Sequence, residues 1–168
     1  FRKMLHHGKT VALAELLLSQ PVVGKELEWF NKVPIHSRET PPHQDGYYFM
    51  IEPQEALTMW IALDEVDEEN GCLRYVRGSH LKGLRPHVRS DIVGFSQGIP
   101  DYEADDRQHE VAVPAQPGDV LVHHSMTIHR ADPNSSPSRN RRSLGMIYYS
   151  TRAKQDAVRL QQYQRKLI

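Results

Sequence analysis

His43 and Asp45 have the residue types and the spacing of a pair of metal ligands. In a β-strand, residues i and i+2 project to the same face. The two side chains could therefore offer an imidazole nitrogen and a carboxylate oxygen to one point in space. Two histidines and one carboxylate on one face of an octahedron leave three positions open, as in non-haem iron(II) oxygenases. This chemistry requires a second histidine from elsewhere in the chain.

The segment from residue 117 to residue 129 is the expected source of that histidine. Pro117-Gly118-Asp119 predicts a turn, and Val120 to His124 predicts the strand that follows it. His124 and His129 could each supply the third ligand, and their spacing leaves the choice open. His123 and His124 would lie on opposite faces of a regular strand, so they cannot both face one metal ion.

An arginine-rich segment, Arg139-Asn140-Arg141-Arg142, leads into a predicted apolar strand. Arg141 shares parity with Ser143 and Gly145, whose small side chains would leave room beside it for a ligand. A guanidinium inside a barrel needs an anion, and a carboxylate can bind it through two hydrogen bonds. A dicarboxylate co-substrate needs metal positions for its oxo-acid end and a cation for its far end. The chain offers both, in that order.

The elements that must position these residues are mostly short strands. A helix is expected over Thr10 to Ser19, and the polar tail from Ala153 is expected to be helical. The expected strands are Thr58 to Asp64, Cys72 to Val76, His109 to Val113, Val120 to His124 and Leu144 to Ser150. Short strands, sparse helix and frequent turns predict a mainly β sandwich or barrel with flanking helices.

Residues 81–108 form a long connection between two of the predicted strands. Connections of this length are often functional lids, and a solvated loop is the alternative. Segment 81–98, with His87 inside it, is expected to contribute to a substrate pocket. The run Tyr47-Tyr48-Phe49 could line that pocket or pack in the core.

The composition excludes several classes of partner. The chain has 168 residues, 21 basic and 21 acidic, so no nucleic-acid or anionic-membrane surface is expected. No apolar run is long enough to span a bilayer. The single cysteine, Cys72, excludes an internal disulfide framework and predicts a reducing, cytoplasmic location. Residues 1–168 suit a single domain, and because the sequence opens on Phe1 we expect part of the N-terminal region of the fold to lie outside it.

Ordered blocks along the chain resemble the phytanoyl-CoA dioxygenase family, a branch of the iron(II)/2-oxoglutarate-dependent oxygenases. The resemblance runs from about Asn31 to Tyr149. The blocks are Pro42-His43-Gln44-Asp45, Trp60-Ile61-Ala62-Leu63-Asp64, Asn70-Gly71-Cys72-Leu73, Gly78-Ser79-His80-Leu81-Lys82-Gly83, Pro86-His87, Gly118-Asp119-Val120 through His129, and Arg141-Arg142-Ser143. Such a series of blocks in one order is far more specific than any single motif.

The resemblance implies a single oxygenase domain built on a double-stranded β-helix, the jelly-roll barrel also called cupin-like. By position, the implied iron(II) ligands are His43, Asp45 and His129. The implied contacts of the co-substrate 2-oxoglutarate are Arg141, at its distal carboxylate, with Trp60 and Gln44. The implied reaction uses O2 to hydroxylate a small organic substrate and releases succinate and CO2. Because related halogenases lack the carboxylate ligand, an aspartate at position 45 favours hydroxylation over halogenation.

Two departures from the family pattern affect the co-substrate site. Many relatives carry a small hydroxyl residue two positions after the last histidine, where this chain has Ala131, so another donor must serve. The loop before Arg141 is one residue longer, which leaves Arg139 and Arg142 as alternative anchors. Two other functions also fit parts of the pattern: a cupin-like metal enzyme that does not use 2-oxoglutarate, and a non-catalytic binding module on the same fold.

Overall fold

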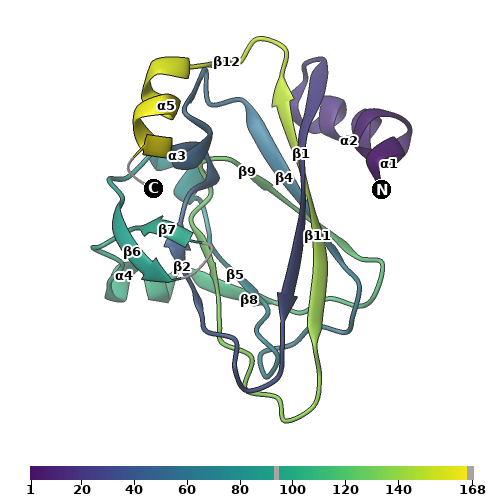
Figure 1. The fold of residues 1–168 in the computed structure, drawn as a ribbon, viewed down its shortest axis with the longest axis vertical. Helices are drawn as coiled ribbons and strands as arrows, with labels where there is room; N and C mark the ends of the chain where they lie inside the picture. The colour runs from purple at the N-terminus through teal and green to yellow at the C-terminus, as the bar shows by residue number, and fades with distance from the viewer. Residues whose placement is uncertain (93–94, 166–168) are drawn as a thin grey trace.

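Two four-stranded antiparallel sheets form the centre of the computed structural model, which describes residues 1–92 and 95–165 (Figure 1). The sheet with the longer strands, called the larger sheet below, has the order β1 (Val22–Lys32), β11 (Arg141–Ser150), β4 (Ala56–Ala62) and β9 (Val120–His124). The smaller sheet has the order β2 (Thr40–His43), β10 (His129–Ala131), β5 (Leu73–Val76) and β8 (Glu110–Val113). Paired sheets of this kind confirm the predicted jelly-roll class.

Two N-terminal helices, α1 (Arg2–His6) and α2 (Lys9–Leu18), cover the outer face of the larger sheet (Figure 1). The alternation along β4 explains why they pack there. Met59 and its parity neighbours Leu57 and Ile61 pack against the helices in one apolar cluster. The cluster also contains Leu5 and Ala14 of the helices and Leu144, Met146 and Tyr148 of β11. Trp60 and Ala62 face the opposite way, into the space between the sheets. Helix α2 confirms the helix predicted over Thr10 to Ser19, and β4 confirms the strand predicted over Thr58 to Asp64, with both of its ends two residues earlier.

Strand β1 was not predicted, and its burial pattern gives the reason. Its inward residues include Glu26 and Glu28, which line a cavity instead of packing in an apolar core. Its outward side carries Leu27 and Trp29, which are 39% and 58% exposed. The usual apolar-in, polar-out alternation is therefore inverted over this stretch, and sequence periodicity does not reveal the strand.

The connection 81–108 is more ordered than a simple loop. After the short 3-10 helix η1 (Ser79–Lys82) it forms the hairpin β6 (Val88–Ile92) and β7 (Phe95–Gly98), and then helix α4 (Ala104–Gln108). The hairpin lies beside β2, where the Ile99 amide donates to the Pro42 carbonyl at 2.8 Å. Residues 93–94 lie outside the described residues. A lid function for this segment stays a prediction.

The remaining elements gather at one end of the barrel (Figure 1). Helix α3 (Asp45–Phe49) follows β2, and β3 (Ile51–Glu52) pairs with β12 (Lys154–Gln155). Helix α5 (Ala157–Arg165) confirms the helical tail, and its Tyr163 hydroxyl bonds to Ser96 of the hairpin. Among residues 1–92 and 95–165, no helix has the length and apolar character needed to cross a bilayer.

Candidate active site

A cavity of about 360 Å³ lies between the two sheets. The larger sheet contributes Glu26, Glu28, Phe30, Thr58, Trp60, His123, Arg141, Ile147 and Tyr149 to its lining. The smaller sheet contributes Thr40, His43, Leu73 and His129, and the end elements contribute Asp45, Tyr48, Phe49, Gln155 and Leu160. Polar and aromatic side chains from distant parts of the sequence therefore meet in one cavity, as in many ligand sites.

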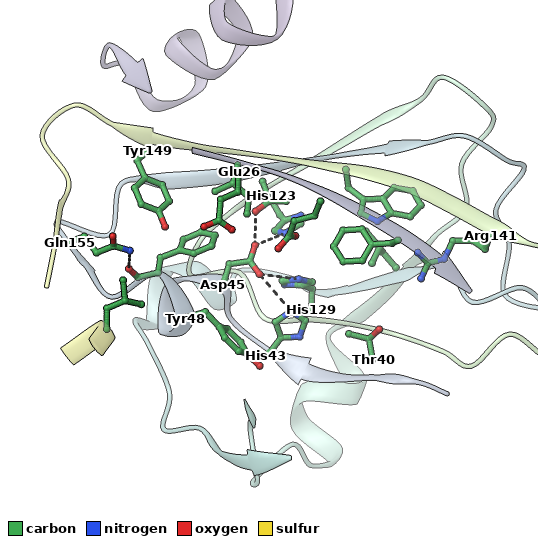
Figure 2. Close-up of a pocket in the computed structure, with 18 residues that line it drawn as sticks. Glu26, Thr40, His43, Asp45, Tyr48, His123, His129, Arg141, Tyr149 and Gln155 are labelled. Atoms are coloured by element: carbon green, nitrogen blue, oxygen red, sulfur yellow. Dashed lines mark hydrogen bonds and ion pairs between the residues drawn. The ribbon is translucent and has the colours of Figure 1, made fainter. Parts of the chain in front are cut away.

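His43, Asp45 and His129 converge inside this cavity (Figure 2). His43 ends β2 and His129 begins β10, and the two residues pair directly across the strands with ring centroids 4.2 Å apart. The Oδ1 atom of Asp45 lies 3.6 Å from the Nε2 atom of each histidine. The three ligand atoms lie within 4.8 Å of one another. Two imidazoles and one carboxylate at this spacing fit the donor set of a mononuclear iron(II) site.

The expectation that His43 and Asp45 share one strand is wrong. Strand β2 stops at His43, and Asp45 is the first residue of helix α3. The two side chains still converge because Gln44, between them, keeps an extended backbone with φ −125° and ψ 126°. Gly46, the residue after Asp45, lies close to Gln54: a Cβ there would lie 2.3 Å from the side-chain oxygen of Gln54, so that side chain would have to move.

Backbone carbonyls fix the orientation of both ligand histidines. The Nδ1 atom of His43 lies 2.8 Å from the carbonyl oxygen of Pro41, and the Nδ1 atom of His129 lies 3.0 Å from that of Thr127. A carbonyl can only accept, so Nδ1 carries the proton in each ring. The Nε2 lone pair is thereby left for a metal ion. Burial, together with the neighbouring His43 and His123, holds the pKa of His129 well below its usual value and favours the neutral ligand form.

Two residues absent from the sequence-based site hold the ligand carboxylate. The Thr58 hydroxyl donates to Asp45 Oδ2 at 2.6 Å, and Nε2 of His123 lies 3.1 Å from the same oxygen. Tyr75 bonds to the other ring nitrogen of His123 at 2.9 Å. Burial alone would raise the pKa of Asp45, but the surrounding histidines, led by His129, hold it well below the usual value. Oδ1 is left to face the two ligand histidines.

His124, the alternative third ligand, does not line the cavity. It lies on the opposite face of β9 from His123, where its Nδ1 accepts the Met126 amide at 3.2 Å and its ring neighbours His80. The structure therefore places His129, and not His124, beside His43 and Asp45.

Arg141 lies at one end of the cavity, and Asp45 lies nearer the middle (Figure 2). The residue is only 3% exposed, and its guanidinium lies over the Trp60 ring, 5.2 Å from the ring centre. It donates to the Gly71 carbonyl at 3.2 Å and to the Ser143 hydroxyl at 3.3 Å. Burial lowers the pKa of Arg141 to about 10. Within residues 1–92 and 95–165 no carboxylate pairs with it. A buried guanidinium without a counter-ion is costly, so this end of the cavity fits an anion.

The two alternative arginines are engaged elsewhere. Arg139 pairs with Asp67 and Glu69, and Arg142 forms an exposed pair with Asp64 at 2.6 Å. Neither arginine lines the cavity.

Gln44 was expected beside the co-substrate, and the structure places it elsewhere. Its side-chain amide donates to the carbonyls of Gly83 and Met126 at 2.9 and 2.7 Å, and its side-chain oxygen accepts the Arg85 amide at 2.8 Å. Gln44 is fully buried and lines no part of the cavity. Gln44 therefore has a structural role in holding neighbouring loops together, because each polar atom of its carboxamide already has a backbone partner.

The other expected pocket residues divide into two groups. Tyr48 and Phe49 line the cavity, whereas Tyr47 stacks on His87 outside it, with ring centroids 4.1 Å apart. His87 accepts the backbone amide of Gln44 at 3.0 Å, and burial lowers the pKa of His87 to about 4. His87 is therefore a neutral structural acceptor.

Ala131, the position where many relatives carry a hydroxyl, is buried among core residues and does not line the cavity. Its partner across the strands is Thr40 of β2, which does line it. Figure 2 shows Thr40 towards the Arg141 end. A hydroxyl is therefore present in this part of the cavity, on the neighbouring strand.

Comparison with known proteins agrees with this geometry. Residues 1–143 match the family model described as phytanoyl-CoA dioxygenase. The chain belongs to the phytanoyl-CoA dioxygenase family. A protein from Arabidopsis thaliana named phytanoyl-CoA dioxygenase is 34% identical over 151 residues, which cover 88% of this chain and 52% of that protein. A phytanoyl-CoA dioxygenase domain-containing protein 1 from Bos taurus is 33% identical over 141 residues, 81% of this chain and 48% of that protein. The chain thus spans about half the length of these family members.

Solved structures of similar fold include two enzymes of nogalamycin biosynthesis. The epimerase SnoN, in complex with Fe3+, alpha ketoglutarate and nogalamycin RO, is 32% identical with a TM-score of 0.74, over 90% of this chain and 59% of SnoN. The alpha ketoglutarate dependent carbocyclase SnoK is 30% identical with a TM-score of 0.77, over 98% of this chain and 64% of SnoK. The expected cofactors, iron(II) and 2-oxoglutarate, agree with these structures and with the donor set found here.

Proposed function

We propose that this domain is an iron(II)- and 2-oxoglutarate-dependent dioxygenase that oxidises a small organic molecule. The observation that carries the proposal is the position of Arg141. A buried guanidinium, with no carboxylate partner in the described part of the chain, shares one cavity with a complete His-Asp-His ligand set. A metal enzyme that does not use a dicarboxylate has no need for such a cation.

The site divides the binding of metal and co-substrate between two sets of residues. His43, His129 and the Oδ1 atom of Asp45 would hold iron(II), with Thr58 and His123 keeping the carboxylate in place. When bound, iron(II) with 2-oxoglutarate and O2 supplies the oxidising power, with succinate and CO2 as products.

At the other end, Arg141 would bind the distal carboxylate of 2-oxoglutarate through its guanidinium fork. Trp60 supports that guanidinium from one side. Thr40 would supply the hydroxyl that Ala131 lacks.

Hydroxylation is the reaction proposed for the substrate. Asp45 is present, so the site retains the ligand whose loss accompanies halogenation. The named reactions of SnoN and SnoK, epimerisation and carbocyclisation, show that related sites direct the same oxidising power to other outcomes.

We further propose a single oxygenase domain in a reducing, cytoplasmic setting, in which Cys72 stays a free thiol.

The test is the dependence of succinate formation on each component. Protein loaded with iron(II) under anaerobic conditions is mixed with 2-oxoglutarate and O2, with and without a panel of metabolites, and succinate and O2 are both measured. We expect succinate that requires iron(II) and 2-oxoglutarate and rises with one class of metabolite. Absence of succinate under every condition would refute the proposal and favour a binding module or a different metal enzyme.

A further inference from the structure

Glu28 places an acidic side chain inside the cavity with no role in holding the metal or the co-substrate. It lies on β1 directly opposite Gly145 of β11. A Cβ on Gly145 would lie 3.4 Å from the Oε2 atom of Glu28 and 3.0 Å from the ring of Phe30. The Glu28 carboxylate therefore lies beside the backbone of β11 at Gly145.

Within the described part of the chain, the Glu28 carboxylate has no hydrogen bond and no ion pair. Glu26, two residues earlier on the same strand, lines the same cavity. Burial, reinforced by the charges of Asp45 and Glu26, raises the pKa of Glu28 to about 7. These facts describe a carboxylate that lacks a cation.

The charges of the loaded site do not supply that cation. Iron(II) carries two positive charges and 2-oxoglutarate two negative charges, and the charge of Arg141 cancels that of Asp45. Arg141 is the only lysine or arginine among the described residues that line the cavity. The charge of Glu28 therefore remains uncompensated after metal and co-substrate bind, and the substrate is the molecule left to balance it. Glu26 is exposed to solvent and adds negative charge beside it.

The surroundings of these glutamates also suit a cation. Tyr48, Phe49 and Tyr149 line the cavity with them. Figure 2 shows Glu26, Tyr48 and Tyr149 on the side of Asp45 away from Arg141. Carboxylates combined with aromatic rings are the groups that proteins use to bind ammonium ions. The Arg141 end and the end with Glu26, Tyr48 and Tyr149 thus lie on opposite sides of Asp45.

We infer that the substrate carries a cationic nitrogen, which Glu28 binds with the help of Glu26 while the rest of the molecule lies over the metal site. Glu28 is then a specificity-determining residue. This inference rests on the proposed function and names the substrate class of the same site.

The test uses two matched pairs of probes: hexylamine with 1-hexanol, and phenethylamine with 2-phenylethanol. Within each pair the carbon skeleton is the same and only the charged group differs. Binding to protein loaded with iron(II) and 2-oxoglutarate is measured anaerobically by calorimetry, so the readout does not depend on turnover. We expect the amines to bind about 10-fold or more tightly than the alcohols, since an ion pair in a partly buried site contributes over 1 kcal/mol.

Glu28→Gln keeps the shape of the side chain and removes its charge, so it should abolish most of the preference for amines. Glu15→Gln, an exposed position on α2, is the matched control and should retain the preference. If Glu28→Gln does not fold, Glu26→Gln replaces it and should reduce the preference. The inference would be overturned if the amine and the alcohol of each pair bound equally, or if the amines did not bind. It would also be overturned if the preference for amines survived removal of the glutamate. Binding of 2-oxoglutarate to the wild-type iron protein, measured in the same experiment, tests the proposed function separately.

Discussion

The metal site in the middle of the cavity and the Arg141 end differ in how completely the protein satisfies its own polar groups. At the metal site, the ligand histidines bond to the carbonyls of Pro41 and Thr127, and Asp45 is held by two side chains. At the Arg141 end, the guanidinium has a carbonyl and a hydroxyl as partners, and no carboxylate within residues 1–92 and 95–165 pairs with it.

The difference shows what each part of the cavity is built to receive. The metal site is organised in advance, so that one nitrogen from each histidine and one oxygen from Asp45 remain for an ion. The Arg141 end lacks half of an ion pair, and that half must come from solution as an anion. Changes at the metal site should therefore affect the metal, and changes at the Arg141 end should affect only the co-substrate.

The largest expected effect is the loss of the ligand carboxylate. Asp45→Ala should reduce iron(II) affinity by more than the roughly 10- to 100-fold that a change of a supporting residue causes, because a ligand itself is removed. Iron content after dialysis against a weak chelator is the measurement. Asp91→Ala, at an exposed position on β6, is the control and should retain iron. Full iron content in Asp45→Ala would refute the ligand assignment.

Arg141→Gln should weaken 2-oxoglutarate binding by roughly 100-fold, since loss of one partner of a buried charge pair costs about 2–5 kcal/mol. Iron content should stay unchanged, which separates the role of the Arg141 end from that of the metal site. Arg142→Gln removes an exposed, already paired arginine and should alter 2-oxoglutarate binding little. Similar losses in both variants, measured by equilibrium dialysis, would contradict the assignment of the anchor.

Thr58→Val should reduce iron(II) affinity by about 10-fold, the lower end of the range for supporting residues. The variant removes the hydroxyl that holds Asp45 Oδ2 but leaves His123 in place. Thr58→Ser keeps the hydroxyl and should restore affinity. A serine variant as weak as the valine variant would show that packing, and not the hydrogen bond, is responsible.

The smallest expected effect is at Thr40. Thr40→Val should weaken 2-oxoglutarate by about 5-fold, the equivalent of one hydrogen bond of about 1 kcal/mol. Thr40→Ser should bind as the wild type does. Unchanged binding in the valine variant would show that Thr40 does not replace the hydroxyl missing at Ala131.

Much of this site could be predicted from residues that are close in sequence. The alternation around Met59 and Trp60 predicts β4 because one side packs under helices and the other faces the cavity. The parity of Arg141 with Ser143 and Gly145 correctly predicts that it points inward.

Features that depend on pairing between distant segments could not be predicted. Thr58 and His123 meet because β4 and β9 pair in one register, and neither residue carries a local signal of that contact. The start of helix α3 also involves a distant segment, since the Gly46 amide donates to the Ser125 carbonyl at 2.8 Å. Strand β1 could not be predicted because its inward residues Glu26 and Glu28 are acidic. Residues that line a cavity do not follow the apolar pattern of residues that fill a core.

The central claim is that the His-Asp-His set and Arg141 bind the two ends of one molecule. The most direct test compares 2-oxoglutarate with 2-oxopentanoate, which keeps the oxo-acid end and replaces the distal carboxylate with a methyl group. Anaerobic titration of the iron(II) protein, followed by the visible absorption of an iron-bound 2-oxo acid, gives both affinities. We expect a preference for 2-oxoglutarate of about 100-fold in the wild type, which Arg141→Gln largely removes. Equal affinities in the wild type, or a preference that persists without Arg141, would contradict the account.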